Sequence, residues 1–151
     1  MRKKENIGRL LACLHRHGHM HLHRAFSSWE LGSGSHHFLL LLAHRDGVTQ
    51  AELTEILHCN KATTARAVRK LRENGYVRKL QDPNDHRAVR IYLTDQGKAL
   101  VPKIKSILRN WTNILTAGFT PAEKQDALRL LGKMVDNAVD EVRGGEFQKN
   151  Y

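Results

Sequence analysis

The sequence predicts a mainly α chain with a small β-hairpin (α+β) and with long helices near its N- and C-terminal ends. Three observations support this prediction. Apolar residues recur at helical spacing near both ends, two short capped segments meet at a tight turn, and two β-type runs follow directly. At 151 residues, the chain is long enough for one domain with appended helices.

The first long helix is predicted over residues 7–29. Its apolar residues fall within an arc of roughly 120° at 100° per residue, the pattern of an amphipathic helix. They are Ile7, Leu11, Leu14, Leu22, Phe26 and Trp29. The segment LGSGS (31–35) ends this helix, and Ser35 is expected to cap a short second helix over residues 36–44.

Two short helices are predicted next. Thr49 and Glu52 have the spacing of a capping box, which predicts a helix that runs to about His58. Asn60 is expected to cap a helix over residues 61–74, and Gly75 to occupy its C′ position. Because only a few residues connect the two helices, we expect a helix-turn-helix.

A hairpin and two further helices complete the predicted order. Residues 76–80 and 88–93 favour strands and flank the turn-rich QDPNDHR (81–87). A helix-turn-helix followed by a hairpin has the order of a winged helix-turn-helix. Long helices are expected over 94–117, capped by Thr94, and from Thr120 onward, where Glu123 closes a second capping box and Pro121 lies at N1.

Positive charge is concentrated on the second short helix and the hairpin. The net charge is +10, which favours a polyanionic partner. Between residues 58 and 90 there are three acidic residues and nine basic ones: Lys61, Arg66, Arg69, Lys70, Arg72, Arg78, Lys79, Arg87 and Arg90. A solvated basic face alone is the simpler interpretation, but the capped helix pair and the basic hairpin favour double-stranded DNA.

The helix over residues 61–74 is predicted to have two distinct faces. Ala65, Ala67, Val68 and Leu71 are expected to pack inward, while Thr63, Arg66, Arg69 and Lys70 point outward. Arginine can bind a guanine edge in the major groove through two hydrogen bonds, and a threonine methyl can contact a thymine methyl. Asn60, Lys61 and Thr64, at the helix N-terminus, are expected near a phosphate.

The chain resembles the MarR family of winged-helix regulators. The family pattern D-x-R-x-x-x-x-x-L-T is present as D85-H-R-A-V-R-I-Y-L-T94, preceded by Asp82-Pro83. The segments T49-Q-A-E-L-T-E-I-L57, K61-A-T-T-A-R-A-V-R-K-L71 and E73-N-G-Y76 are also similar to the family. His86 departs from the pattern, because the family often has arginine there, and this weakens the positive charge of the wing slightly.

The resemblance implies a sequence-specific regulator, expected to be a repressor, that binds a pseudo-palindromic operator as a homodimer. It implies that Arg87 enters the minor groove from the wing, oriented by Asp85, while Arg66 and its neighbours read the major groove. The predicted DNA-binding residues are Asn60, Lys61, Thr63, Thr64, Arg66, Arg69, Lys70, Asp85, Arg87 and Arg90. A non-specific architectural DNA-binding protein is the alternative that shares this charge.

The predicted organisation has residues 1–34 and 94–145 as a helical dimerisation region and 35–93 as the winged helix-turn-helix, intertwined in a single domain. One small winged domain cannot cover all the apolar stripes of the long helices, whereas two copies can. Packing of these helices on one another within one chain is the alternative. The resemblance further implies a small aromatic or phenolic effector that releases DNA; no cofactor is predicted.

The stretch HRHGHMHLHR (15–24) places histidine at every second position. On a helix it forms one row of His15, His19 and His23 and a second of Cys13, His17 and His21. The simplest interpretation is a polar helix flank. A zinc-responsive regulator, a proton-sensitive interface and peroxide sensing at Cys13, as in another branch of the family, are the alternatives.

Several other classes are disfavoured. The sequence has no GxSxG, HExxH or phosphate-loop motif, so no enzyme is expected. The longest apolar run, Phe38–Ala43, is too short to cross a membrane. Two cysteines without a CxxC motif favour a reduced cytoplasmic location, where Cys59 is expected simply to pack in the turn between helices.

Overall fold

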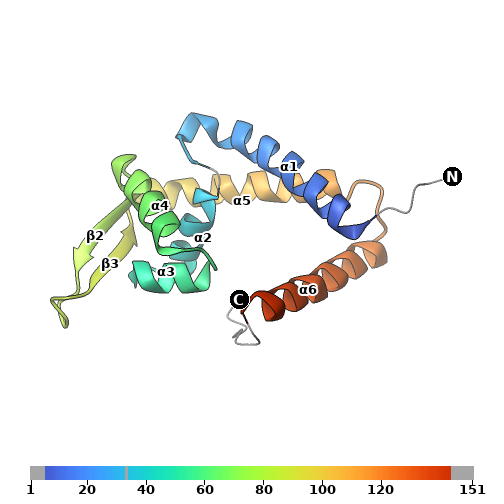
Figure 1. Ribbon diagram of the computed structural model, residues 1–151. Helices are drawn as coiled ribbons and strands as arrows, with labels where there is room; N and C mark the ends of the chain where they lie inside the picture. The colour runs from blue at the N-terminus through green and yellow to red at the C-terminus, as the bar shows by residue number, and fades with distance from the viewer. Residues whose placement is uncertain (1–5, 33, 144–151) are drawn as a thin grey trace. The chain divides into compact units, whose positions relative to one another are not determined.

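A computed structural model describes residues 6–32 and 34–143 (Figure 1). Its elements are α1 (Ile7–Phe26), the 3-10 helix η1 (Ser27–Trp29), α2 (Ser35–His44), β1 (Val48–Thr49), α3 (Gln50–Ile56), α4 (Lys61–Glu73), β2 (Val77–Gln81), β3 (Val89–Leu93), α5 (Asp95–Leu115) and α6 (Pro121–Arg143). The predicted fold class, mainly helical with a small β-hairpin wing, is confirmed.

Local hydrogen bonds explain where most helices begin. The Thr49 hydroxyl accepts from the Glu52 N–H while the Glu52 carboxylate accepts from the Thr49 N–H, so the predicted capping box is present. The Asn60 side chain accepts from the Thr63 N–H at 2.8 Å and caps α4. Thr120 and Glu123 form the second predicted capping box at the start of α6.

Two predicted helix ends differ from the structure. The first helix ends at Phe26 and continues as a 3-10 turn to Trp29, where Glu30 takes a positive φ of 53°. Ser35 is the first residue of α2 rather than its cap, because Gly34 precedes it with a φ of 78° and no side chain closes the helix start.

The sheet has three strands rather than the two predicted. β1 pairs antiparallel with β3 through Val48–Ile91 and Thr49–Arg90, and β3 pairs with β2 from Val77–Leu93 to Gln81–Val89. A strand of two residues has too little alternation to be recognised by its pattern. β1 ties the start of α3 to the base of the hairpin.

The chain divides into two compact units, residues 1–109 and 110–151. The core of the first unit brings together residues from the end of α1 and from α2, α3, α4, the sheet and α5. Phe26, Leu39, Leu53, Leu71 and Ile91 are among its fully buried side chains. Burial of one such side chain contributes roughly 1.5–3 kcal/mol, so this core holds both α3 and α4 firmly.

Large apolar residues remain exposed on both units. On α1 they are Ile7, Leu10, Leu11 and Leu14, and on α6 they include Leu128, Leu131 and Val135. Across the described ranges, no helix is both long enough and apolar enough to cross a membrane.

Candidate nucleic-acid interface

The two short helices α3 and α4 are joined by a tight turn at residues 57–60. His58 takes a positive φ of 53° in this turn, and the Cys59 thiol lies 3.0 Å from the Thr64 hydroxyl. The Thr54 hydroxyl donates to the Thr64 hydroxyl oxygen at 2.8 Å. These polar contacts link α3, the turn and α4.

The prediction that Thr64 lies near a phosphate is wrong, because Thr64 is 0% exposed. The inward stripe of α4 consists of Thr64, Ala67, Val68 and Leu71, at positions i, i+3, i+4 and i+7. Ala65, which was expected to pack inward, is exposed instead. A threonine can occupy the central position of an apolar stripe when its hydroxyl is hydrogen-bonded, as it is here.

The outward face of α4 carries the predicted basic side chains. Arg66, Arg69 and Lys70 are exposed, and Thr63 beside them is half-buried. The Arg66 guanidinium lies 3.5 Å from the Thr63 hydroxyl, at the limit of a hydrogen bond. Lys61 and Asn60 lie exposed at the N-terminus of the same helix. This face is therefore cationic and accessible.

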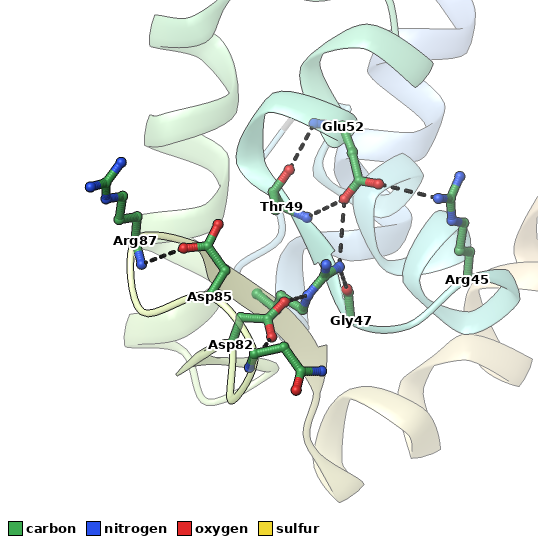
Figure 2. Close-up of polar contacts among 9 residues, drawn as sticks. Arg45, Gly47, Thr49, Glu52, Asp82, Asp85 and Arg87 are labelled. Atoms are coloured by element: carbon green, nitrogen blue, oxygen red, sulfur yellow. Dashed lines mark hydrogen bonds and ion pairs between the residues drawn. The ribbon is translucent and has the colours of Figure 1, made fainter.

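The tip of the hairpin is shaped by two aspartates that accept hydrogen bonds from nearby backbone. Asp82 Oδ1 accepts from the Asn84 N–H at 2.8 Å, and Asp85 Oδ1 accepts from the Arg87 N–H at 3.0 Å (Figure 2). Asp85 thus positions the backbone of Arg87 rather than its guanidinium. The Arg87 side chain is exposed and points away from Asp85 in Figure 2.

Arg90 is held by groups at the base and near the tip of the hairpin. Its Nε donates to Asp82 Oδ2, and its Nη1 donates to the Gly47 carbonyl at 2.8 Å. The same guanidinium lies 3.9 Å from the Glu52 carboxylate. Through Nε and Nη1, Arg90 therefore braces the wing, and its predicted contact with DNA stays a prediction.

Glu52 extends this brace towards α2. Its Oε1 accepts from the Arg45 guanidinium at 3.2 Å, while its Oε2 accepts from the Thr49 N–H at 2.8 Å. We call Arg45, Glu52, Arg90 and Asp82 the wing brace. Hydrogen bonds from Arg90, then from the Asn84 N–H, lower the pKa of Asp82, and the hydrogen bond from the Thr49 N–H is the main reason that the pKa of Glu52 is also lowered.

Asp82 and Gly47 hold the Arg90 guanidinium in place, which the sequence alone did not predict. Gly47 has a φ of 75°, and a Cβ there would lie 2.8 Å from the ring of Tyr92, so a larger residue would displace that ring. Nothing in the local sequence indicates that the Gly47 carbonyl meets Arg90, 43 residues later.

The histidine run lies on α1, as predicted. His15, His17, His19 and His23 are exposed, and the Cys13 thiol lies 3.5 Å from His17 Nδ1. His17 Nδ1 also lies 2.8 Å from the Cys13 carbonyl oxygen. Among the residues that the structure describes, no three histidine, cysteine or acidic side chains are grouped for a metal ion.

Comparisons with known proteins agree with this architecture. The sequence profile of the MarR family matches residues 31–89, which include α2 to the start of β3. A MarR transcriptional regulator from Methanosarcina mazei Go1 is similar in structure, with a TM-score of 0.81 and 34% identity over 89% of this chain and 96% of that one.

Two further relatives extend the comparison. The HTH-type transcriptional regulator BilQ of Clostridioides difficile strain CD3 is 24% identical over 91% of this chain and 94% of its own. A MarR family regulator from Listeria monocytogenes, solved with a 26mer DNA, has a TM-score of 0.83 and 25% identity over 97% of this chain and 99% of its own. The chain belongs to the MarR family of DNA-binding transcriptional regulators.

Proposed function

We propose that the protein is a cytoplasmic, sequence-specific repressor that binds a pseudo-palindromic operator as a homodimer. The observation that carries this proposal is the exposed cationic face of α4 beside a hairpin whose tip presents Arg87. Arg66, Arg69 and Lys70 supply donors that suit guanine edges and phosphates in the major groove. A narrow minor groove concentrates negative potential and attracts a projecting arginine such as Arg87.

The exposed apolar residues of the long helices support a homodimer. Ile7, Leu11 and Leu14 on α1 and Leu128 and Val135 on α6 are all large and solvent-exposed in one chain. A second copy that covers them would remove this apolar area from water and would present two α4 helices by twofold symmetry. We expect the two helices to enter successive major grooves about 34 Å apart. A dimer seated on a promoter represses by occupancy alone, without a further protein contact.

Selection of bound fragments from random double-stranded DNA tests this proposal. We expect an inverted repeat with half-sites about one DNA turn apart, bound by two chains in sedimentation experiments. Affinity should fall steeply with salt, since each neutralised phosphate releases counterions. Arg66→Ala should weaken binding to the selected site, whereas Arg109→Ala, an exposed arginine on α5, should not. A monomer that binds all sequences equally would contradict the proposal and favour an architectural role.

We further propose that a small aromatic or phenolic effector releases the DNA, by favouring a spacing of the two α4 helices that does not match the operator. His36 is the feature that favours such a ligand. It is 4% exposed, its ring lies 5.0 Å from that of Phe26, and its Nδ1 is buried without a hydrogen-bond partner among the described residues. Burial first, and the neighbouring His37 second, lower the pKa of His36 to about 4.

A neutral imidazole with an unpaired nitrogen can accept a hydrogen bond from a phenol or, in the other tautomer, donate one to a carboxylate. A thermal-shift titration with salicylate tests this assignment. We expect salicylate to raise the melting temperature of the natural chain and to lower its operator affinity, and His36→Phe to reduce both effects. Equal responses of the two chains would remove His36 from the effector site.

A further inference from the structure

Three histidines form a row along one side of α1. His15, His19 and His23 are all exposed and lie at positions i, i+4 and i+8 of one helix. Within residues 6–32 and 34–143, no hydrogen bond or ion pair holds any of these three imidazoles. The rings of His19 and His23 lie nearly parallel, at an interplanar angle of 13°, with centroids 6.3 Å apart.

We propose that this row binds one borderline divalent transition-metal ion, such as Zn²⁺ or Ni²⁺, between two imidazoles on adjacent helical turns. Imidazole nitrogen is a preferred ligand for these ions. With metal–nitrogen bonds of about 2.1 Å, two rings on a tetrahedral ion have centroids about 5 Å apart. The His19–His23 centroid distance of 6.3 Å is close to this value, and rotation of the two exposed side chains would turn one nitrogen of each ring towards a common ion. Water completes the coordination.

The geometry of the row makes His19 the shared ligand. His15 and His23 are separated by about 12 Å along the helix axis, too far for both to bind one ion. The ion therefore lies between His15 and His19 or between His19 and His23. The second row differs, because His17 Nδ1 is already in hydrogen-bond contact with the Cys13 carbonyl at 2.8 Å.

Zinc titration of the full-length chain, purified without a polyhistidine tag, tests the proposal. The parent for this series carries His17→Asn, so that the row of Cys13, His17 and His21 loses its middle ligand. Binding is measured at about pH 7.5 by calorimetry with Zn²⁺ alone, since imidazole binds metal in its neutral form. His44→Asn is the matched control, because His44 is exposed and has no histidine four residues away.

We expect one Zn²⁺ per chain. His15→Asn and His23→Asn should each weaken binding by at most about twofold, because one pair survives. His19→Asn and the double variant His15→Asn with His23→Asn should each weaken it at least tenfold, since even loss of an outer-shell partner costs roughly 10–100-fold. His44→Asn should change nothing. Three results would overturn the proposal. They are a Zn²⁺ affinity of His19→Asn within twofold of the parent, complete loss of Zn²⁺ binding in His15→Asn or in His23→Asn alone, and a stoichiometry of one ion per two chains.

Hydrogen exchange provides a second readout that does not depend on DNA binding. An ion that bridges adjacent turns stabilises the helix between them, so Zn²⁺ should slow exchange of amides over residues 15–23. The effect should be absent in His19→Asn. Unchanged exchange in the parent at saturating Zn²⁺ would contradict chelation along α1.

Discussion

Helix α4 and the tip of the hairpin wing are held in place by different forces. α4 is seated by an inward stripe that includes Val68 and Leu71, each 1% exposed, and its basic side chains are left without partners in the core. The strands of the wing contribute Val77, Ile91 and Leu93 to the same core, and Arg90 of the wing brace additionally holds Asp82 near the tip. The guanidinium of Arg90 thus helps to fix the wing, whereas Arg66, Arg69 and Lys70 on the outward face of α4 remain exposed.

The largest effect should come from a substitution in the inward apolar stripe of α4. Leu71→Ala leaves a cavity in the core and should destabilise the fold by roughly 2–5 kcal/mol. Urea denaturation followed by circular dichroism measures this, with Arg69→Ala, on the outward face, as a control that should retain its stability. Equal stability of the two variants would mean that α4 is not seated by this stripe.

The next effect concerns the wing tip. Arg87→Ala should weaken operator binding by about 1–3 kcal/mol, which is the usual worth of a specific arginine contact. The folded state should be unaffected, because Arg87 is exposed. Fluorescence anisotropy with the selected operator measures the change, and Arg87→Lys separates charge from shape. Unchanged operator affinity in Arg87→Ala would contradict a contact between Arg87 and DNA.

Acid should weaken the core through His36. Because the pKa of His36 is lowered to about 4 in the folded state, the folded chain binds fewer protons than the unfolded chain at intermediate pH. The associated stability is complete above about pH 6.5 and is lost as the pH falls towards 4, by about 2 kcal/mol at pH 5. Urea denaturation at several pH values should show a smaller loss in His36→Phe; parallel curves would contradict the assignment.

The smallest effect should come from the wing brace. Arg90→Ala frees the Asp82 carboxylate and the Gly47 carbonyl, so the hairpin should move more without unfolding. We expect a loss of operator affinity below about tenfold, smaller than for Arg87→Ala, and faster hydrogen exchange over residues 82–88. Unchanged exchange in this segment would show that Arg90 does not fix the wing.

Local patterns predicted much of this fold correctly. The capping boxes at Thr49 and Thr120 and the cap at Asn60 depend on residues within a few positions, so their spacing alone predicts them. The predictions were wrong where a contact between different elements determines whether a residue is buried or paired. Thr64 is buried because Thr54 and Cys59 complete its hydrogen bonds, and β1 exists only because β3 returns beside it.

The sequence by itself determined the order of helices, the hairpin, the cationic outward face of α4 and the resemblance to the MarR family. These depend on periodicity, caps and charge, which are local properties of the chain. Only the tertiary structure decided that Arg90 and Asp82 brace the wing and that His36 is buried with an unpaired nitrogen. Such roles depend on which groups folding brings within hydrogen-bond distance, and residue type alone does not specify that.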